Sequence, residues 1–433
     1  MEISELYDLF LRHPAVTTDT RDCPEGALFF ALRGTSFNGN DFATAALAAG
    51  CAYAVVDDPR LRGDDRLIHV DNALSTLQQL AALHRRTLGI PVLQITGTNG
   101  KTTTKELVAA VLGEGFRVLF TSGNFNNHIG VPKTLLRLRP EHEMAVIETG
   151  ANHPGEIAAL SRIVDADCGL ITNVGKAHLE GFGSFEGVVR TKGELYDYLR
   201  TKPGAFIFLN ADNPHLCPIS QGLAHISYGR TGKGYDVEGE VLSCDPYLRF
   251  RWRRKEGEWQ EVATHLIGAY NLDNLLAAAA VGIRFGIADN RITHALAGYE
   301  PTNNRSELQD TGRNRLIIDA YNANPTSMKA ALENFAQMEH PHKMAILGEM
   351  RELGTAEEEE HRRILEMLPA LRCEEVWLVG EAFRKAAGNN GTFRCFATVG
   401  EVKKMLEESP VSDRLVLIKG SNSTRLYQLP ESL

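Results

Sequence analysis

The most constraining feature of this 433-residue chain is a glycine-rich loop set between an apolar run and an amphipathic run. The apolar run covers residues 92–95, and the loop reads GTNGKTT over residues 97–103. Apolar residues then recur at helical spacing at Leu107, Val108, Val111 and Leu112. This order predicts strand, turn and helix, the opening of a βα unit. Consecutive backbone N–H groups in such a loop form an anion cradle beside a helix N-terminus.

The loop also contains the side chains that a phosphate site needs. Lys101 can reach the β- and γ-phosphates of a nucleotide, and the Thr102 hydroxyl can ligate Mg²⁺. Only two residues separate Gly97 from Gly100, so the loop departs from the general G-x-x-x-x-G-K-[ST] pattern, and a glycine-rich turn with a solvated lysine is the alternative. We predict that the following residues bind the nucleotide: Gly97, Thr98, Asn99, Gly100, Lys101, Thr102 and Thr103.

The rest of the chain reads as α/β structure in three segments. Residues 1–88 alternate short apolar runs with turn signals and end in a helical pattern, which predicts a small α/β domain. Residues 89–312 carry all-apolar runs separated by helical patterns, typical of a mostly parallel sheet covered on both faces. Within this segment the alternating stretch 236–261 is expected to form an antiparallel hairpin insertion. Residues 313–433 resemble a smaller doubly wound domain.

The composition excludes several classes of protein. The net charge of −9 disfavours a large nucleic-acid footprint, so we expect no nucleic-acid partner. No apolar run approaches about 18 residues, and no basic start precedes an apolar run, so neither a transmembrane segment nor a signal peptide is expected. The seven cysteines are scattered without a CxxC pair, which disfavours a zinc site and a disulfide framework. We therefore expect reduced thiols and a cytoplasmic protein.

Three further positions are candidates for metal chemistry, each with a plainer alternative. Glu148 follows the apolar run 144–147, where α/β proteins place metal-binding carboxylates, although such a residue can simply cap a turn. His178 also lies just past an apolar run, and a packing histidine is its alternative. Lys192 opens a helical run, and the pattern alone indicates a surface lysine.

The stretch ITGTNGKTTT resembles the nucleotide loop of the Mur ligases and of their relatives, the folylpolyglutamate synthetases. The segments VIETGANHPGE, ITNVGKAHLEGFGS and TKGELYDYL follow in that family's order, and the match covers nearly the whole chain. The resemblance implies a UDP-sugar-binding domain at 1–88, a central phosphate-loop ATPase at 89–312 and a C-terminal Rossmann-like ligase domain at 313–433. It also implies ATP and two Mg²⁺ ions, and we expect a monomer.

The same resemblance assigns roles around the metals. It makes Thr102, Glu148 and His178 ligands of Mg²⁺, and it makes Lys192 a lysine carbamylated by CO₂, whose new oxygens ligate a metal. Lys101, His178 and Lys192 then form the catalytic set. Carbamylation requires a neutral amine, so the site of Lys192 must disfavour the ammonium form.

Further segments of the chain resemble those that, in this family, contact the rest of the nucleotide and the substrates. Asn271 and Asn274 lie three residues apart and so share a helix face, which in the family faces the adenine and phosphates. By resemblance Arg305 contacts phosphate and Asp319 the ribose; a surface ion pair and a loop cap are the alternatives. Candidate substrate contacts come from three segments, TDTRDCPEG through NGNDF, SGNFNNHIG and DAYNANP: Thr20, Arg21, Asn38, Gly39, Asn126, Asn127, Tyr321, Asn322 and Asn324. A structural β-turn is the alternative for the first segment and a polar loop for the second.

The segment DAYNANP resembles the family members that add a dipeptide, and the DNPR motif of the members that add meso-diaminopimelate is absent. The implied partners are UDP-N-acetylmuramoyl-tripeptide and D-alanyl-D-alanine, joined through an acyl phosphate in peptidoglycan precursor synthesis. Either meso-diaminopimelate or lysine fits as the third residue of the tripeptide. A sibling ligase, or one that adds glutamate to folate, is the first alternative, and a nucleotide-gated switch without ligation is the second.

Overall fold

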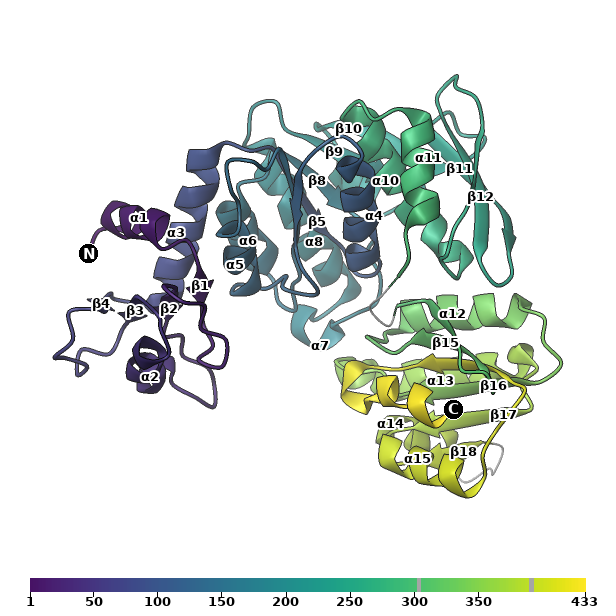
Figure 1. Ribbon diagram of the computed structural model, residues 1–433. Helices are drawn as coiled ribbons and strands as arrows, with labels where there is room; N and C mark the ends of the chain where they lie inside the picture. The colour runs from purple at the N-terminus through teal and green to yellow at the C-terminus, as the bar shows by residue number, and fades with distance from the viewer. Residues whose placement is uncertain (302–304, 389–392) are drawn as a thin grey trace.

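The computed structural model describes residues 1–301, 305–388 and 393–433, and builds them around three β-sheets (Figure 1). We name the domains by their sheets: N-terminal, central and C-terminal. The N-terminal sheet is parallel throughout, in the order β1-β2-β3-β4. Its elements are α1 (Ile3–Arg12), β1 (Val16–Thr17), β2 (Leu28–Phe30), α2 (Ala43–Ala48), β3 (Tyr53–Val56), β4 (Leu67–His69) and α3 (Ala73–Leu88).

The central sheet has nine strands in the order β13-β12-β11-β10-β9-β8-β5-β7-β6. Its strands are β5 (Val92–Thr96), β6 (Val118–Phe120), β7 (Met144–Glu148), β8 (Cys168–Ile171), β9 (Phe206–Asn210), β10 (Ala224–Arg230), β11 (Val237–Cys244), β12 (Leu248–Arg254) and β13 (Gln260–Ala263). Its helices are α4 (Lys101–Gly113), α5 (Gly130–Leu135), α6 (Glu156–Val164), α7 (Leu179–Phe182), α8 (Phe185–Arg200), α9 (Leu216–Ile219), α10 (Leu272–Arg284) and α11 (Asp289–Gly298). The predicted strand–loop–helix at the phosphate loop is confirmed as β5 and α4.

Helices cover both faces of the central sheet, as the all-apolar strands predict. Within β7, Ala145 and Ile147 pack in the core that holds the apolar sides of α5, α6 and α8. Their neighbours Met144 and Val146 point to the opposite face, into the core with α4, α10 and α11. Alternate residues of one strand thus build two cores, because side chains along a strand alternate between faces.

The predicted hairpin within 236–261 is confirmed for β11 and β12, which pair antiparallel. It is not a separate insertion, however, because β11 also pairs in parallel with β10, and β13 extends the same ladder beyond β12. The hairpin therefore forms one edge of the central sheet. The alternation of exposed and buried residues in β12 shows why the sequence pattern marked it as a half-buried strand.

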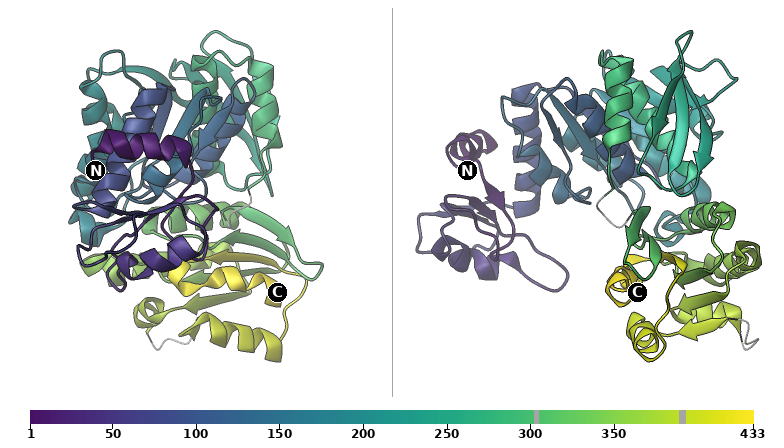
Figure 2. Two further views of the ribbon diagram at one scale, coloured as in Figure 1. Left: turned by 60° about the vertical axis from the view of Figure 1, so that its left-hand side comes forward. Right: turned by 45° about the vertical axis from the view of Figure 1, so that its right-hand side comes forward.

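The C-terminal sheet has the order β14-β15-β19-β16-β17-β18, and only the pair β14–β15 is antiparallel. The views in Figure 2 show it with its helices below the central domain. Its elements are β14 (Glu307–Asp310), β15 (Arg315–Asp319), α12 (Pro325–Gln337), β16 (Lys343–Gly348), α13 (Glu357–Met367), β17 (Glu375–Val379), α14 (Glu381–Ala387), β18 (Arg394–Phe396), α15 (Val399–Glu408) and β19 (Leu415–Lys419). The expected α/β fold with a Rossmann-like third domain is confirmed.

One strand lies on the other side of a predicted boundary. β14 precedes residue 312, where the sequence placed the end of the central domain, yet it pairs with β15 of the C-terminal sheet. Its sequence, ELQD, has no apolar run because an edge strand is exposed along one side. The third sheet therefore begins earlier in the chain than the sequence pattern indicated.

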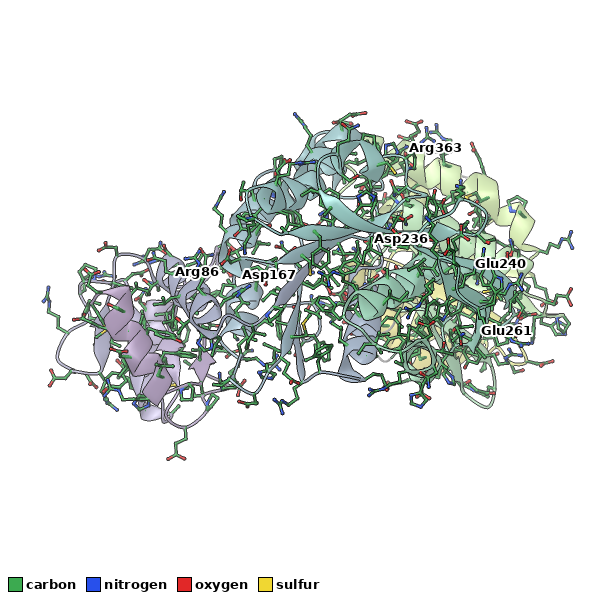
Figure 3. All side chains as sticks on the ribbon, turned by 90° about the horizontal axis from the view of Figure 1, so that it is seen from above. Arg86, Asp167, Asp236, Glu240, Glu261 and Arg363 are labelled. Atoms are coloured by element: carbon green, nitrogen blue, oxygen red, sulfur yellow. The ribbon has the colours of Figure 1, made fainter. Side chains whose placement is uncertain are left out.

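Helix α3 joins the N-terminal domain to the central one. Arg85 is buried on this helix, donates to the backbone carbonyls of Val164 and Asp165, and pairs with Asp167 at 2.7 Å. Figure 3 labels Arg86 and Asp167 at this junction. The hydrophobic core around α3 also continues into α5 and α6, so the two domains share packed side chains as well as ion pairs. Among the described residues, no helix is long and apolar enough to cross a membrane.

Candidate active site

The phosphate loop, residues 97–103, has a backbone that requires its two glycines. Gly97 and Gly100 have φ angles of 144° and 76°. A Cβ on Gly97 would lie 2.0 Å from Thr172 Oγ1, and one on Gly100 would lie 2.5 Å from Asn274 Oδ1. Asn173 accepts the Asn99 N–H at 3.0 Å through its side chain and so fixes the loop against β8. Sequence spacing and local geometry therefore agree on an anion-binding turn.

Lys101 folds over this loop. Its Nζ donates to the carbonyls of Gly97 and Thr98 at 2.9 and 3.0 Å. Burial lowers the pKa of Lys101, and the nearby charge of Arg305 lowers it further, whereas the Glu148 carboxylate acts in the opposite direction. The three charged groups that the sequence assigned to phosphate and metal binding therefore lie close enough to influence one another.

Two polar atoms beside Lys101 are buried without a partner. Thr102 Oγ1 and Glu148 Oε2 make no hydrogen bond to any residue that the structure describes. The other carboxylate oxygen, Glu148 Oε1, accepts a 2.7 Å hydrogen bond from Asn126 Nδ2. Buried oxygen atoms without partners are costly unless a ligand satisfies them. A hydroxyl and a carboxylate are also the oxygen donors that Mg²⁺ takes from proteins, together with substrate phosphates and water, so these residues fit the implied metal.

The loop that carries Asn126 is held by a buried lysine that the sequence did not single out. Lys105 is fully buried in α4, and its Nζ donates to the carbonyls of Thr121 and Gly123 at 2.7 and 3.3 Å. It also lies 3.4 Å from a Glu106 carboxylate oxygen. One turn of α4 thus supplies Thr102 at its start and then fixes the loop that orients Glu148.

His178 and Lys192 lie close enough to Lys101 for its charge to act on both. Burial lowers the pKa of His178, the Glu352 carboxylate opposes this effect, and the charges of Lys101 and Lys192 add to it. The net lowering favours the neutral imidazole that binds metals. Lys192 is 2% exposed, and its Nζ contacts the Ala151 carbonyl at 3.5 Å. Burial lowers the pKa of Lys192 to about 7, and the charge of Lys101 contributes. Lys192 is therefore not the surface lysine that the local pattern indicated.

The residues assigned to the rest of the nucleotide form paired contacts. Asn274 donates to Asn271 Oδ1 at 2.8 Å, and both residues are buried. The guanidinium of Arg305 lies 3.8 Å from the centre of the Tyr321 ring. Asp319 accepts from the Nζ of Lys419 at 2.5 Å. Lys419 is buried in β19, at the strand's carboxyl end, where doubly wound sheets bind ligands.

These residues line one cavity of about 1210 Å³ between the domains. The predicted residues that line it are Thr98, Asn99, Gly100, Lys101, Thr102, Thr103, Asn126, Asn127, Glu148, His178, Asn271, Asn274, Arg305, Asp319, Tyr321 and Asn322. Gly97, Lys192 and Asn324 lie outside the lining, although Asn324 hydrogen bonds to Asn99. The structure thus brings together segments more than 200 residues apart in the sequence.

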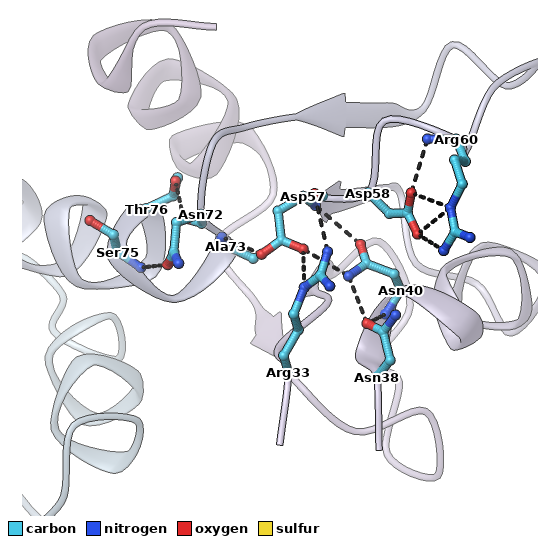
Figure 4. Close-up of polar contacts among 10 residues, drawn as sticks. All are labelled: Arg33, Asn38, Asn40, Asp57, Asp58, Arg60, Asn72, Ala73, Ser75 and Thr76. Atoms are coloured by element: carbon cyan, nitrogen blue, oxygen red, sulfur yellow. Dashed lines mark hydrogen bonds and ion pairs between the residues drawn. The ribbon is translucent and has the colours of Figure 1, made fainter. Parts of the chain in front are cut away.

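The predicted UDP-sugar contacts do not line this cavity. Asn38 Oδ1 accepts a hydrogen bond from the Asn40 side chain (Figure 4). The side chains of Asn40 and Arg33 both donate to the Asp57 carboxylate. Gly39 is packed against the Leu32 backbone, where a Cβ would lie 2.4 Å from the carbonyl oxygen. The remaining two candidates lie in the turn that follows β1, where Arg21 pairs with Asp19 and Thr20 is half-buried. Asn38 and Gly39 are thus fixed in a turn by contacts within the N-terminal domain.

Sequence reasoning also missed one wall of the cavity. Helix α3 contributes Gln78, Gln79 and Arg86, and α6 contributes Glu156 and Arg162. The helical period of α3 does place polar residues along one face, but such a face is usually solvated, so the pattern does not mark a binding surface.

Comparisons with known proteins agree with this arrangement. The family models described as "Mur ligase family, catalytic domain", "Mur ligase middle domain" and "Mur ligase, glutamate ligase domain" match residues 14–93, 95–282 and 304–422. The UDP-N-acetylmuramoyl-tripeptide–D-alanyl-D-alanine ligase of Bacillus subtilis is 35% identical, with 96% of this chain and 92% of that protein covered. The enzyme of the same name from Escherichia coli is 34% identical, with 97% and 93% covered.

Solved structures resemble the chain over almost its whole length. MurF from Acinetobacter baumannii aligns with a TM-score of 0.87 at 30% identity, covering 97% of this chain and 93% of that one. MurF ligase from Thermotoga maritima in complex with ADP aligns with a TM-score of 0.86 at 25% identity, covering 98% and 97%. The three family models and the relatives that match over almost the whole chain show that this protein belongs to the Mur ligase family.

Proposed function

We propose that this chain is an ATP-dependent ligase that joins D-alanyl-D-alanine to UDP-N-acetylmuramoyl-tripeptide, with release of ADP and phosphate. The observation that carries the proposal is the pair of unpartnered buried oxygens, Thr102 Oγ1 and Glu148 Oε2, beside Lys101 in the interdomain cavity. The near full-length relatives that carry this ligase name support the choice of substrates.

The reaction begins with attack of the tripeptide carboxylate on the γ-phosphate of ATP, which forms an acyl phosphate and ADP. The amine of D-alanyl-D-alanine then attacks the acyl carbon, loses a proton, forms the amide, and expels phosphate. Lys101 would leave the loop carbonyls and stabilise the charge of the transferring phosphoryl group. The backbone N–H groups of residues 97–103 would hold the phosphates at the start of α4.

Thr102 and Glu148 would hold one Mg²⁺, and His178 with a carbamylated Lys192 would hold a second. When bound, Mg²⁺ supplies charge neutralisation of the phosphates. The buried setting of Lys192 supports the modification, because its pKa of about 7 leaves a neutral, nucleophilic amine near physiological pH. Asn126 would keep Glu148 oriented through its 2.7 Å hydrogen bond.

At the other end of ATP, Asp319 would bind the ribose hydroxyls, and Asn271 and Asn274 would face the base and phosphates. Arg305, stacked on Tyr321, would contact phosphate. Tyr321, Asn322 and Asn324 belong to the same segment, and the first two line the cavity where the dipeptide would approach. We further propose that the N-terminal domain binds the UDP-sugar through Thr20, Arg21, Asn38 and Gly39, with α3 forming the wall that faces the central domain.

The test is a phosphate-release assay in which each substrate is omitted in turn. Phosphate should appear at the full rate only when ATP, UDP-muramoyl-tripeptide and D-alanyl-D-alanine are all present, and mass spectrometry should find the UDP-pentapeptide. A single amino acid that replaces the dipeptide would support a sibling ligase. Folate with glutamate as the productive pair would support the synthetase alternative. Phosphate release that is independent of every acceptor would support a nucleotide switch.

A further inference from the structure

His178 of the central domain contacts a carboxylate that comes from the C-terminal domain. Glu352 lies between β16 and the short 3-10 helix Gly354–Ala356, and its Oε2 contacts the Nδ1 of His178. The backbone carbonyl of Glu352 also accepts the N–H of Glu180 at 3.3 Å. Both the main chain and the side chain of Glu352 therefore face the segment that carries His178.

The two partners are held in unusual backbone conformations. Glu352 has a φ of 63° and His178 a φ of 50°, so both lie in the left-handed region that non-glycine residues seldom occupy. Such conformations persist where the surrounding structure fixes them, and they concentrate at functional sites. The segment before Glu352 is fixed in its own domain, because the Met350 N–H donates to His361 Nε2 at 3.0 Å.

The contact leaves one ring nitrogen of His178 for another ligand. Nδ1 faces Glu352, whereas Nε2 makes no hydrogen bond within the described part of the chain, and the residue lines the cavity. Histidines that bind metals almost always donate their second ring N–H to a carboxylate or carbonyl, which fixes the tautomer and the ring orientation. The side chains of Glu352 and His178 have this relationship across a domain interface.

We propose that Glu352 is a positioning residue that holds His178 with its proton on Nδ1 and presents Nε2 to the second metal ion. Because the carboxylate belongs to the C-terminal domain, that metal site is complete only when this domain is docked on the central one. The inference rests on the proposed function for the existence of the second metal, and it assigns this chain a link between domain docking and metal binding.

A second ion pair across the same interface provides a matched control. Lys176 Nζ lies 2.7 Å from Glu360 Oε1. In the sequence, Lys176 precedes His178 by two residues, and Glu360 follows Glu352 by eight. This pair joins the same two domains but does not touch the imidazole. Glu360→Gln therefore removes one charge pair between the domains and leaves the contact between Glu352 and His178 in place.

The experiment measures Mn²⁺ binding to the full chain by electron paramagnetic resonance, with a non-hydrolysable ATP analogue present. Wild type should bind two ions, and Glu352→Ala should weaken one of them about 10- to 100-fold, as loss of such a partner does elsewhere. Glu352→Gln should recover most of that affinity, since its amide oxygen still accepts from Nδ1. Glu360→Gln should leave both sites unchanged. Combining His178→Ala with Glu352→Ala should weaken the site no further than His178→Ala alone.

Several outcomes overturn the inference. Unchanged Mn²⁺ binding in a folded Glu352→Ala variant would do so, and so would equal losses in Glu352→Ala and Glu360→Gln, which would reduce Glu352 to a docking contact. The inference would also be overturned if His178→Ala bound Mn²⁺ as the wild type does. Failure of the proposed function is distinguished by product analysis of the wild type, which is independent of the Mn²⁺ titration. A melting curve for each variant establishes that it is folded.

Discussion

Asn324 at the start of α12 donates from Nδ2 to the Oδ1 of Asn99 in the phosphate loop at 2.7 Å. The same side chain caps its own helix, because its Oδ1 accepts the Ser327 N–H at 2.9 Å. One residue of the C-terminal domain therefore caps the start of a helix and contacts the phosphate loop of the central domain.

The two contacts of Asn324 can be separated by substitution. Asn324→Ser keeps a helix cap but cannot donate to Asn99, so stability should stay near wild type while the KM for ATP rises several-fold. Asn324→Ala loses the cap as well and should lower the free energy of unfolding by about 1 kcal/mol. Denaturant unfolding and steady-state kinetics measure the two effects. A wild-type KM for ATP in Asn324→Ser would show that the interdomain amide contact is irrelevant to nucleotide binding.

Lys101→Ala should abolish most of the ligation while leaving the fold intact. Removing a charge that stabilises the transferring phosphoryl group costs about 100-fold or more in kcat. Because Lys101 hydrogen bonds only to the loop carbonyls within the described residues, melting should change little. Turnover close to wild type in a folded Lys101→Ala variant would remove the phosphate-loop assignment.

Lys105→Met should destabilise the central domain. The substitution leaves the Thr121 and Gly123 carbonyls without their buried charged donor, so a loss of about 3 kcal/mol is expected. Lys329→Met is the control, since Lys329 is exposed and its pair with Glu333 spans one helical turn; its change should stay within about 0.5 kcal/mol. Equal unfolding midpoints for the two variants would contradict the anchoring role of Lys105.

Carbamylation of Lys192 should depend on pH in a defined direction. Its folded pKa of about 7 lies below that of the unfolded chain, so the neutral amine becomes dominant as pH rises through about 7. Above that pH the unfolded state binds more protons at Lys192 than the folded state does. An unmodified Lys192 therefore makes the free energy of unfolding increase as pH rises. At constant dissolved ¹³CO₂, the carbamate carbon signal in ¹³C spectra should grow between about pH 6 and about pH 8.

Lys192→Met provides the control for that experiment and should lack the carbamate signal. Lys192→Ala should be nearly inactive, and acetate should partly restore its activity by placing an oxygen anion in the vacated space. An identical signal in Lys192→Met would locate the modification elsewhere. A fully active Lys192→Ala variant would remove the metal-ligand role and leave the phosphate loop unaffected.

Much of the fold follows directly from the sequence, because the buried strands are mostly apolar. Val92–Ile95, Met144–Ile147 and Leu415–Ile418 belong to interior strands of their sheets, where both faces are covered. Edge strand β14 escaped prediction since its exposed side is polar. Hydrophobic periodicity indicates which face of a helix or strand is buried. The pattern is least regular where neighbouring elements cover only part of that face.

The candidate site was predictable where chemistry depends on neighbours in sequence, as in the phosphate loop. It was not predictable where it depends on burial or on distant partners. Lys105 has the same local pattern as a solvated lysine, and only the fold places it under the loop that follows β6. Glu352 and His178 are 174 residues apart, so no spacing rule connects them. The role of Lys192 was implied by the family resemblance alone, whereas its burial became visible in the structure.

The most direct test of the acyl-phosphate ligase account follows the oxygen atoms of the substrate. UDP-muramoyl-tripeptide labelled with ¹⁸O in its terminal carboxylate is incubated with the chain, ATP and D-alanyl-D-alanine, and the released phosphate is analysed by mass spectrometry. The account predicts one ¹⁸O atom in each phosphate, because the carboxylate oxygen that attacks ATP leaves with the phosphoryl group, together with formation of the UDP-pentapeptide. Phosphate without ¹⁸O would mean that ATP is cleaved by water, and would contradict the account.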